Sequence, residues 1–319
     1  MVQILSPPSR SEVKAIEYLE YAARKAQDIF DNNKAIEFYS RLLEKIGDSD
    51  VERSIDYQLS KCKVLELIGD WEDAKEIMIE LLESLDDDTY ELEIGNIYSQ
   101  IGSINFKQGN YELAEEYIQK QLDIAPKNNP IGEAVAWGQL GRLFIETGRL
   151  DEAKDYFDKQ LDFYINKSME SDVAISHRSL GQLALKKGDL DDAYNESESA
   201  YKLSLELDQL WEQSLALGNM GIVKRTKGEY AEALTIFNKV LEINEDIGDQ
   251  MAISQSFTNL GNTYRDIRDF DKALESFEAQ IKICKSIGYE SGLAGGLNNL
   301  GTVYNETGKY KSAINSLQQ

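Results

Sequence analysis

The stretch LGNTYRDIRDFDKALESF, residues 260–277, decides the fold, because its pattern returns along this 319-residue chain at a fixed interval. Its Leu-Gly pair belongs to a series of glycines spaced 39 or 40 residues apart. The glycines of this series are Gly102, Gly141, Gly181, Gly221, Gly261 and Gly301. An alanine follows each of them twelve residues later. Self-similarity at a period of this length indicates a stack of equivalent structural units.

Each period predicts two amphipathic helices joined by a tight turn. Apolar residues in EALTIFNKVLEI, residues 232–243, recur at spacings of three and four, as on one face of a helix. A second glycine, seven residues after the first, supplies the turn in most repeats, whereas Arg268 takes that position in one of them. The first glycine and the alanine are small where the two helices cross. One helix pair cannot bury its apolar face alone, so neighbouring pairs stack.

The pattern extends backwards to the start of the chain. Cys62 replaces the first glycine before Ala74, and Ala23 replaces it before Ala35. We expect an all-α, right-handed superhelical solenoid of about eight helix-turn-helix repeats, forming a single array over residues 13–319 after a leader over residues 1–12. The repeats are predicted to start near residues 13, 51, 89, 131, 171, 210, 250 and 290, and the last is incomplete.

These recurring positions resemble the tetratricopeptide repeat (TPR) family, whose helix-turn-helix unit is usually about 34 residues long. The longer period is similar to a subtype found in spindle-orientation adaptors and in bacterial peptide-sensing regulators, and residues 241–264, LEINEDIGDQMAISQSFTNLGNTY, are close to it. Residues 15–46 also resemble the first repeat after the ATPase core of large bacterial signalling ATPases. That second resemblance implies a sensor array cut from a longer protein.

Composition narrows the classes of partner and compartment. The net charge of −23 argues against nucleic acid, because phosphate binding needs clustered Lys and Arg. No run approaches the eighteen or so apolar residues of a membrane helix, and the first residues lack the features of a signal peptide. The two cysteines, Cys62 and Cys284, are typical of buried thiols in a protein from a reducing compartment. We expect a cytoplasmic protein that does not bind a membrane.

Catalytic chemistry finds little support in the sequence. His177 is the single histidine, so the sequence offers little support for a Ser-His-Asp catalytic triad and contains no cluster of histidines that could bind a metal. A phosphate-binding loop is missing, and the acidic run at residues 86–88 lacks the alternation and glycine of a calcium loop. We therefore predict no enzyme activity, no metal site and no cofactor.

The resemblance implies that the first helix of each repeat lines a concave face, at positions two before and one and four after the repeat glycine. From the sixth repeat onward these positions hold mainly asparagine and arginine. Asparagine can both donate to and accept from an extended peptide backbone, and arginine can hold a carboxylate through two hydrogen bonds. The predicted binding residues are Arg142, Asn219, Arg225, Asn259, Asn262, Arg265, Asn299 and Asn305.

The charge is distributed unevenly along the chain. Residues 210–319 hold 11 basic and 14 acidic residues, whereas the first 209 residues hold 23 basic and 43 acidic residues. The nearly neutral part suits an acidic or carboxylate-bearing segment in repeats six to eight. Alternatively, the asparagines came with duplication of the repeats or bond a neighbouring helix. Thr258 stands where a two-carboxylate clamp for chaperone tails needs lysine, which disfavours that ligand.

The function predicted from these features is a protein–protein interaction module that binds a peptide or protein segment, as an adaptor or sensor. One alternative is the regulatory sensor array of a multidomain ATPase or protease. The other is a structural scaffold that associates weakly with itself through the C-terminal end, residues 310–319.

Overall fold

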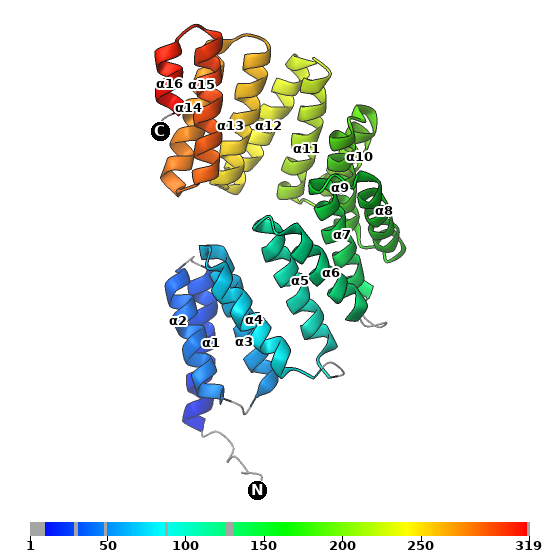
Figure 1. Ribbon diagram of the computed structural model, residues 1–319, viewed down its shortest axis with the longest axis vertical. Coiled ribbons are helices and arrows are strands. Elements are labelled where there is room, and N and C mark those ends of the chain that lie inside the picture. Colours follow the sequence, from blue (N-terminus) through cyan, green and yellow to red (C-terminus); the bar gives the residue numbers. More distant parts are fainter. Residues whose placement is uncertain (1–9, 29–30, 48–49, 87–88, 125–129, 318–319) are drawn as a thin grey trace. The chain divides into compact units, whose positions relative to one another are not determined.

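The computed structural model describes residues 10–317 apart from 29–30, 48–49, 87–88 and 125–129. These residues form helices and no strand, as predicted (Figure 1). The residues of the predicted leader up to position 9 lie outside this description, as do Asp87 and Asp88 of the acidic run.

The helices of the described residues follow one another in pairs joined by short turns. They are α1 (Arg10–Asp28), α2 (Asn32–Ile46), α3 (Val51–Ile68), α4 (Trp71–Ser84), α5 (Glu91–Lys107), α6 (Tyr111–Ile124), α7 (Pro130–Glu146), α8 (Leu150–Asn166), α9 (Glu170–Lys187), α10 (Leu190–Glu206), α11 (Leu210–Thr226), α12 (Tyr230–Ile247), α13 (Gln250–Asp266), α14 (Phe270–Ile287), α15 (Glu290–Glu306) and α16 (Tyr310–Leu317).

The chain divides into two compact units, Met1–Leu143 and Phe144–Gln319. In the first unit, α1 packs on α2, α3 on α4 and α5 on α6; in the second, α9 packs on α10, α11 on α12, α13 on α14 and α15 on α16. The second helix of a pair also packs on the first helix of the next pair, for example α12 on α13. Within each unit the helices therefore stack as TPR-like repeats.

The small residues of the pattern lie where paired helices meet, as the sequence predicts. A Cβ atom added at Gly221 would lie 2.5 Å from Cε1 of Phe237, and one at Gly261 would lie 2.6 Å from Cε1 of Phe277. Both phenylalanines are fully buried. A side chain at either glycine would therefore overlap the buried ring of Phe237 or Phe277, so the ring or the helix that carries it would have to shift.

The turn between paired helices needs left-handed backbone at its second glycine. Gly228 adopts a φ of 78°, and Arg268, which replaces glycine in the next repeat, adopts a φ of 63°. The arginine thus keeps the turn geometry despite its side chain, at some cost in backbone strain.

Both cysteines are buried free thiols, as predicted. Cys62 occupies a position that is glycine in the repeats from Gly102 onward, and its Sγ donates to the carbonyl oxygen of Ala74 at 3.5 Å. Burial raises the pKa of the Cys62 thiol to about 12. No helix of the described residues is long and apolar enough to cross a membrane.

Candidate functional site

A cavity of about 400 Å³ opens among the first helices of the sixth and seventh repeats in the second unit. We call it the α11–α13 cavity. Its lining comprises Trp211, Ser214, Leu215, Gly218, Asn219 and Ile222 of α11, Val240 and Asn244 of α12, Asp249, Met251, Ala252, Gln255, Ser256 and Asn259 from the start and body of α13, and Tyr289 before α15. These α11 positions are spaced by one, three or four residues, so one face of that helix supplies them.

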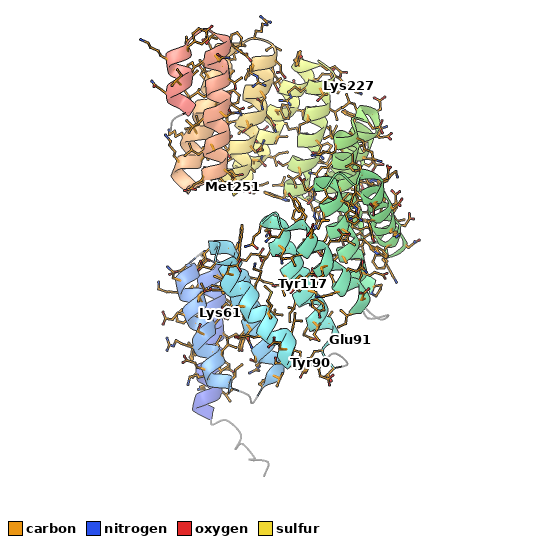
Figure 2. The ribbon with its side chains drawn as sticks, in the orientation of Figure 1. Lys61, Tyr90, Glu91, Tyr117, Lys227 and Met251 are labelled. Carbon is orange, nitrogen blue, oxygen red and sulfur yellow. The ribbon has the colours of Figure 1, made fainter. Side chains whose placement is uncertain are left out.

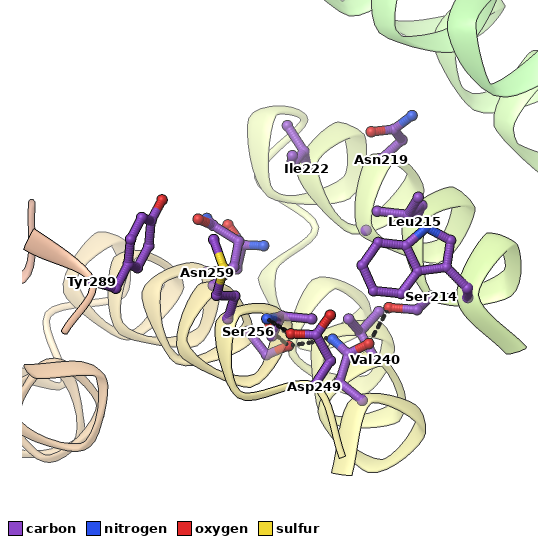
Figure 3. A pocket seen from close by; sticks show the side chains of 15 residues that line it. Ser214, Leu215, Asn219, Ile222, Val240, Asp249, Ser256, Asn259 and Tyr289 are labelled. Atoms are coloured by element: carbon purple, nitrogen blue, oxygen red, sulfur yellow. Dashed lines mark hydrogen bonds between the residues drawn. The ribbon is translucent and has the colours of Figure 1, made fainter. Parts of the chain in front are cut away.

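Large apolar side chains form the walls of the α11–α13 cavity. Trp211 and Met251 stand at equivalent positions in consecutive repeats, ten residues before the repeat glycine, and are 46% and 51% exposed. Figure 2 labels Met251 in the first turn of α13, and Figure 3 shows Tyr289 on one side of the cavity and Leu215 on the other. Exposed apolar side chains around a cavity favour an apolar group of a ligand.

The floor of the cavity is a buried hydrogen-bond network that joins three helices (Figure 3). Ser214 Oγ donates to Asn244 Oδ1 at 2.6 Å, and Asn244 Nδ2 donates to Ser256 Oγ at 3.0 Å. Asn244 is 2% exposed. Because every member of such a network is held by another, it rigidifies the floor and fixes the spacing of α11, α12 and α13.

Two of the predicted binding residues, Asn219 and Asn259, line this cavity (Figure 3). Asn219 is 7% exposed, and its Nδ2 has no hydrogen-bond partner among the described residues. A buried amide nitrogen without a partner is unfavourable by roughly 1–3 kcal/mol. Rotation of this side chain toward a ligand carbonyl would relieve that cost.

The predicted arginines of this unit lie elsewhere and already face a carboxylate. Arg225 Nε is 3.8 Å from Asp266 Oδ2, and Arg265 Nη2 is 4.0 Å from Asp266 Oδ1. Arg265 and Asp266 line a separate cleft of about 580 Å³, together with Arg268 and Thr302. Two guanidinium groups therefore share one carboxylate at long distance and keep unused donors.

The remaining predicted residues are not brought into the α11–α13 cavity. Asn262 and Asn299 are half-buried and Asn305 is exposed, and none of the three lines it. Arg142 is exposed and belongs to the first unit. Sequence reasoning missed the apolar walls, although the repetition of a large apolar residue at positions 211 and 251 was a usable signal. It also missed Asp266, which directly follows Arg265 in the sequence.

Stacked helix pairs with a cavity on their first helices define the class of helical-repeat interaction proteins. The tetratricopeptide repeat family matches residues 93–166, 172–246, 212–286 and 250–319. The chain therefore belongs to the tetratricopeptide repeat family. No curated protein matches it.

Several solved structures share the fold at low sequence identity. A Rap protein complexed with competence and sporulation factor is 16% identical, with a TM-score of 0.66 over 97% of this chain and 96% of that one. NprR in complex with its cognate peptide NprX is 16% identical, with a TM-score of 0.65 over 97% and 89%. A STAND protein with a tetratricopeptide repeat sensor, from Pyrococcus horikoshii, is 14% identical, with a TM-score of 0.66 over 98% and 46%.

Proposed function

We propose that the second unit binds an extended peptide or protein segment along α11 and α13, and that the protein acts as an adaptor or sensor without catalysis of its own. The α11–α13 cavity carries this proposal, because it combines apolar walls, a rigid polar floor and the amide nitrogen of Asn219, which has no hydrogen-bond partner among the described residues. A cavity of about 400 Å³ accommodates one or two apolar side chains of a ligand. The two related structures that contain a factor or a peptide are consistent with this class of ligand.

The asparagines supply the contacts to the ligand backbone. Asn219 and Asn259 occupy the same position in consecutive repeats, and Asn299 continues the series. Carboxamides can meet both the N–H and the C=O groups of an extended strand, so they bind the chain of the ligand regardless of its side chains. The apolar walls then select which side chain enters the cavity.

The arginines favour a carboxylate on the same ligand. Arg225 and Arg265 are each 26% exposed and share Asp266, so an incoming carboxylate would compete with Asp266 for their free donors. This competition makes the arginines a secondary contribution and the cavity the primary one.

A sensor role in a larger assembly is the second candidate, since one similar structure carries its tetratricopeptide repeats as the sensor of a STAND protein. The chain spans 46% of that protein. The free buried thiols Cys62 and Cys284 support a cytoplasmic location.

Selection of displayed random peptides on the full chain tests the proposal. A selected peptide should change the fluorescence emission of Trp211, and Trp211→Phe should remove that change. The double substitution Asn219→Ala and Asn259→Ala should weaken binding by about 10- to 100-fold, because two hydrogen bonds are lost. Peptides that bind without changing this emission, and equally well to the double variant, would place the site elsewhere.

A further inference from the structure

The first unit contains a second, chemically different cleft that no predicted binding residue lines. Its volume is about 570 Å³, and side chains of α1, α2, α3 and α5 surround it. Its α3 residues Arg53, Tyr57, Ser60 and Lys63 recur at spacings of three and four, so they share one face of that helix. We call this the first-unit cleft.

Cationic side chains outnumber carboxylates in the first-unit cleft, although the unit itself is acidic. Arg24, Arg53 and Lys63 line it together with the carboxylates of Glu20 and Asp56. Residues 1–143 as a whole hold 15 basic and 28 acidic residues. Four glutamates of α4, Glu72, Glu76, Glu80 and Glu83, line a different cleft.

The cations of the cleft retain free hydrogen-bond donors. Arg24 Nη2 lies 2.7 Å from Glu20 Oε1, and the side chain of Arg24 is 71% exposed. Arg53 Nε lies 3.5 Å from Asp50 Oδ2, and the side chain of Arg53 is 56% exposed. Lys63 is exposed and forms no ion pair among the described residues. A guanidinium group carries five N–H donors, so most of them remain available to an anion.

Two buried polar atoms in the cleft have no partner among the described residues. The hydroxyl of Tyr57 and Oε1 of Gln100 are both buried and unbonded, and Tyr57 is only 5% exposed. Burial, with a smaller effect of Glu20, raises the pKa of Tyr57. The hydroxyl therefore stays protonated at neutral pH and can donate a hydrogen bond. The neighbouring Tyr39 offers a contrast, because its hydroxyl donates to Gln27 at 3.0 Å.

We propose that the first-unit cleft binds an acidic peptide segment. Its carboxylate receives hydrogen bonds from the Tyr57 hydroxyl and from the guanidinium groups of Arg24 and Arg53. Lys63 lies ten residues after Arg53, or about 15 Å further along α3. That distance equals about four extended residues, so a segment rather than a compact acid meets both ends of the cleft. The site shares no residue with the α11–α13 cavity and does not depend on the function proposed for it.

A fluorescein-labelled peptide of alternating glutamate and glycine is the probe, with a glutamine-glycine peptide as its neutral counterpart. Binding is measured by fluorescence anisotropy on the full chain carrying Gly218→Leu, which fills the cavity of the second unit. Arg225→Gln and Arg265→Gln are added so that those arginines contribute nothing. We expect the glutamate peptide to bind at least about tenfold more tightly than the glutamine peptide.

Substitutions in the cleft then separate a binding role from a structural one. Tyr57→Phe should lower the affinity for the glutamate peptide about tenfold. It should not lower the melting temperature of the protein, because the hydroxyl that is lost has no hydrogen-bond partner among the described residues. Tyr39→Phe removes a hydroxyl that is hydrogen-bonded to Gln27, and should lower the melting temperature. Arg53→Gln with Lys63→Gln should abolish most of the binding, whereas Arg41→Gln with Lys45→Gln, two cations of α2 outside the cleft, should not change it.

The proposal would be overturned by equal affinity for the glutamate and glutamine peptides, by unchanged affinity in Tyr57→Phe, or by equal losses of affinity in the cleft variant and the α2 variant. Displacement of the peptide by citrate at the same concentration as by unlabelled peptide would also overturn it, because the site would then accept a compact acid.

Discussion

Replacing Gly218 with leucine separates folding from binding in the α11–α13 cavity. Gly218 lies inside α11 and lines the cavity, and an added Cβ meets no atom within 4 Å. A leucine there grows into the empty space and overlaps the position of a ligand side chain. The same change removes a glycine from a helix interior, which favours the helix by about 0.5–1 kcal/mol.

The two effects have opposite signs. The free energy of unfolding should rise by about 0.5–1 kcal/mol in urea titrations followed by circular dichroism. The affinity for a selected peptide should fall by about 10- to 100-fold, since burial of a leucine-sized side chain contributes roughly 1.5–3 kcal/mol. Few substitutions that impair binding also stabilise the fold, so this combination identifies the cavity as the site.

Gly295→Leu is the matched control. Gly295 is a helical glycine of α15 with equally open space, and it does not line the cavity. It should give the same gain in stability while leaving most of the affinity intact. Unchanged peptide affinity in Gly218→Leu, together with the expected gain in stability, would show that no ligand side chain enters the cavity.

Three further substitutions test other parts of the structure. Ala233→Leu places a large side chain at a fully buried crossing and should destabilise the fold by about 1–3 kcal/mol in thermal melts, whereas Ala231→Leu on the exposed side of α12 should change little; equal melts would refute the repeat register. Asp266→Asn should raise the affinity for a carboxylate-bearing peptide about threefold at low salt, because it frees Arg225 and Arg265, and a loss of affinity would refute the competition. Tyr310→Ser with Ile314→Ser removes the exposed apolar side chains of α16, which are 65% and 55% exposed, and should abolish concentration-dependent association in sedimentation velocity; a wild-type protein that stays monomeric would refute self-association.

The fold could be predicted because its determinants repeat. Gly221 and Gly261 leave space for Phe237 and Phe277, sixteen residues further along the chain, and this pairing is visible in the sequence as a fixed spacing. A residue that is glycine at six consecutive repeats, from Gly102 to Gly301, reports on the short distance between two helices. Local spacing and tertiary packing are therefore the same information in this chain.

The candidate site could be predicted only in part. The repeat register grouped Asn219 of α11 with Asn259 of α13, because the two residues hold the same position in consecutive repeats, and both line the α11–α13 cavity. It could not show that Asp266 lies between Arg225 and Arg265, since that contact depends on side-chain conformation across two helices. For the same reason, the hydrogen bonds of Asn244 to Ser214 and Ser256 could not be predicted from the sequence.

The net charge of a segment is a poor guide to the faces of a helical repeat. Counting along the chain gave 23 basic and 43 acidic residues in the first 209 residues, and so favoured an acidic ligand only in repeats six to eight. Paired helices nevertheless divide these charges, so that Arg24, Arg53 and Lys63 meet in one cleft while the glutamates of α4 line another. A helix is about 10 Å across, which is close to the Debye length at 0.1 M salt.

An acidic ligand near the first unit is therefore subject to two electrostatic interactions, a long-range repulsion by the excess of carboxylates and a short-range attraction inside the cleft. These two interactions depend differently on the salt concentration. At about 0.01 M the Debye length is near 30 Å, and the excess of carboxylates over residues 1–143 repels the ligand before it reaches the cleft. At about 0.1 M that repulsion is screened, while the hydrogen bond from the buried Tyr57 hydroxyl inside the cleft is screened much less. The association rate of the glutamate peptide should therefore rise between these two salt concentrations. A rate that falls steadily with salt would mean that the ligand approaches a surface whose charge is positive at long range as well.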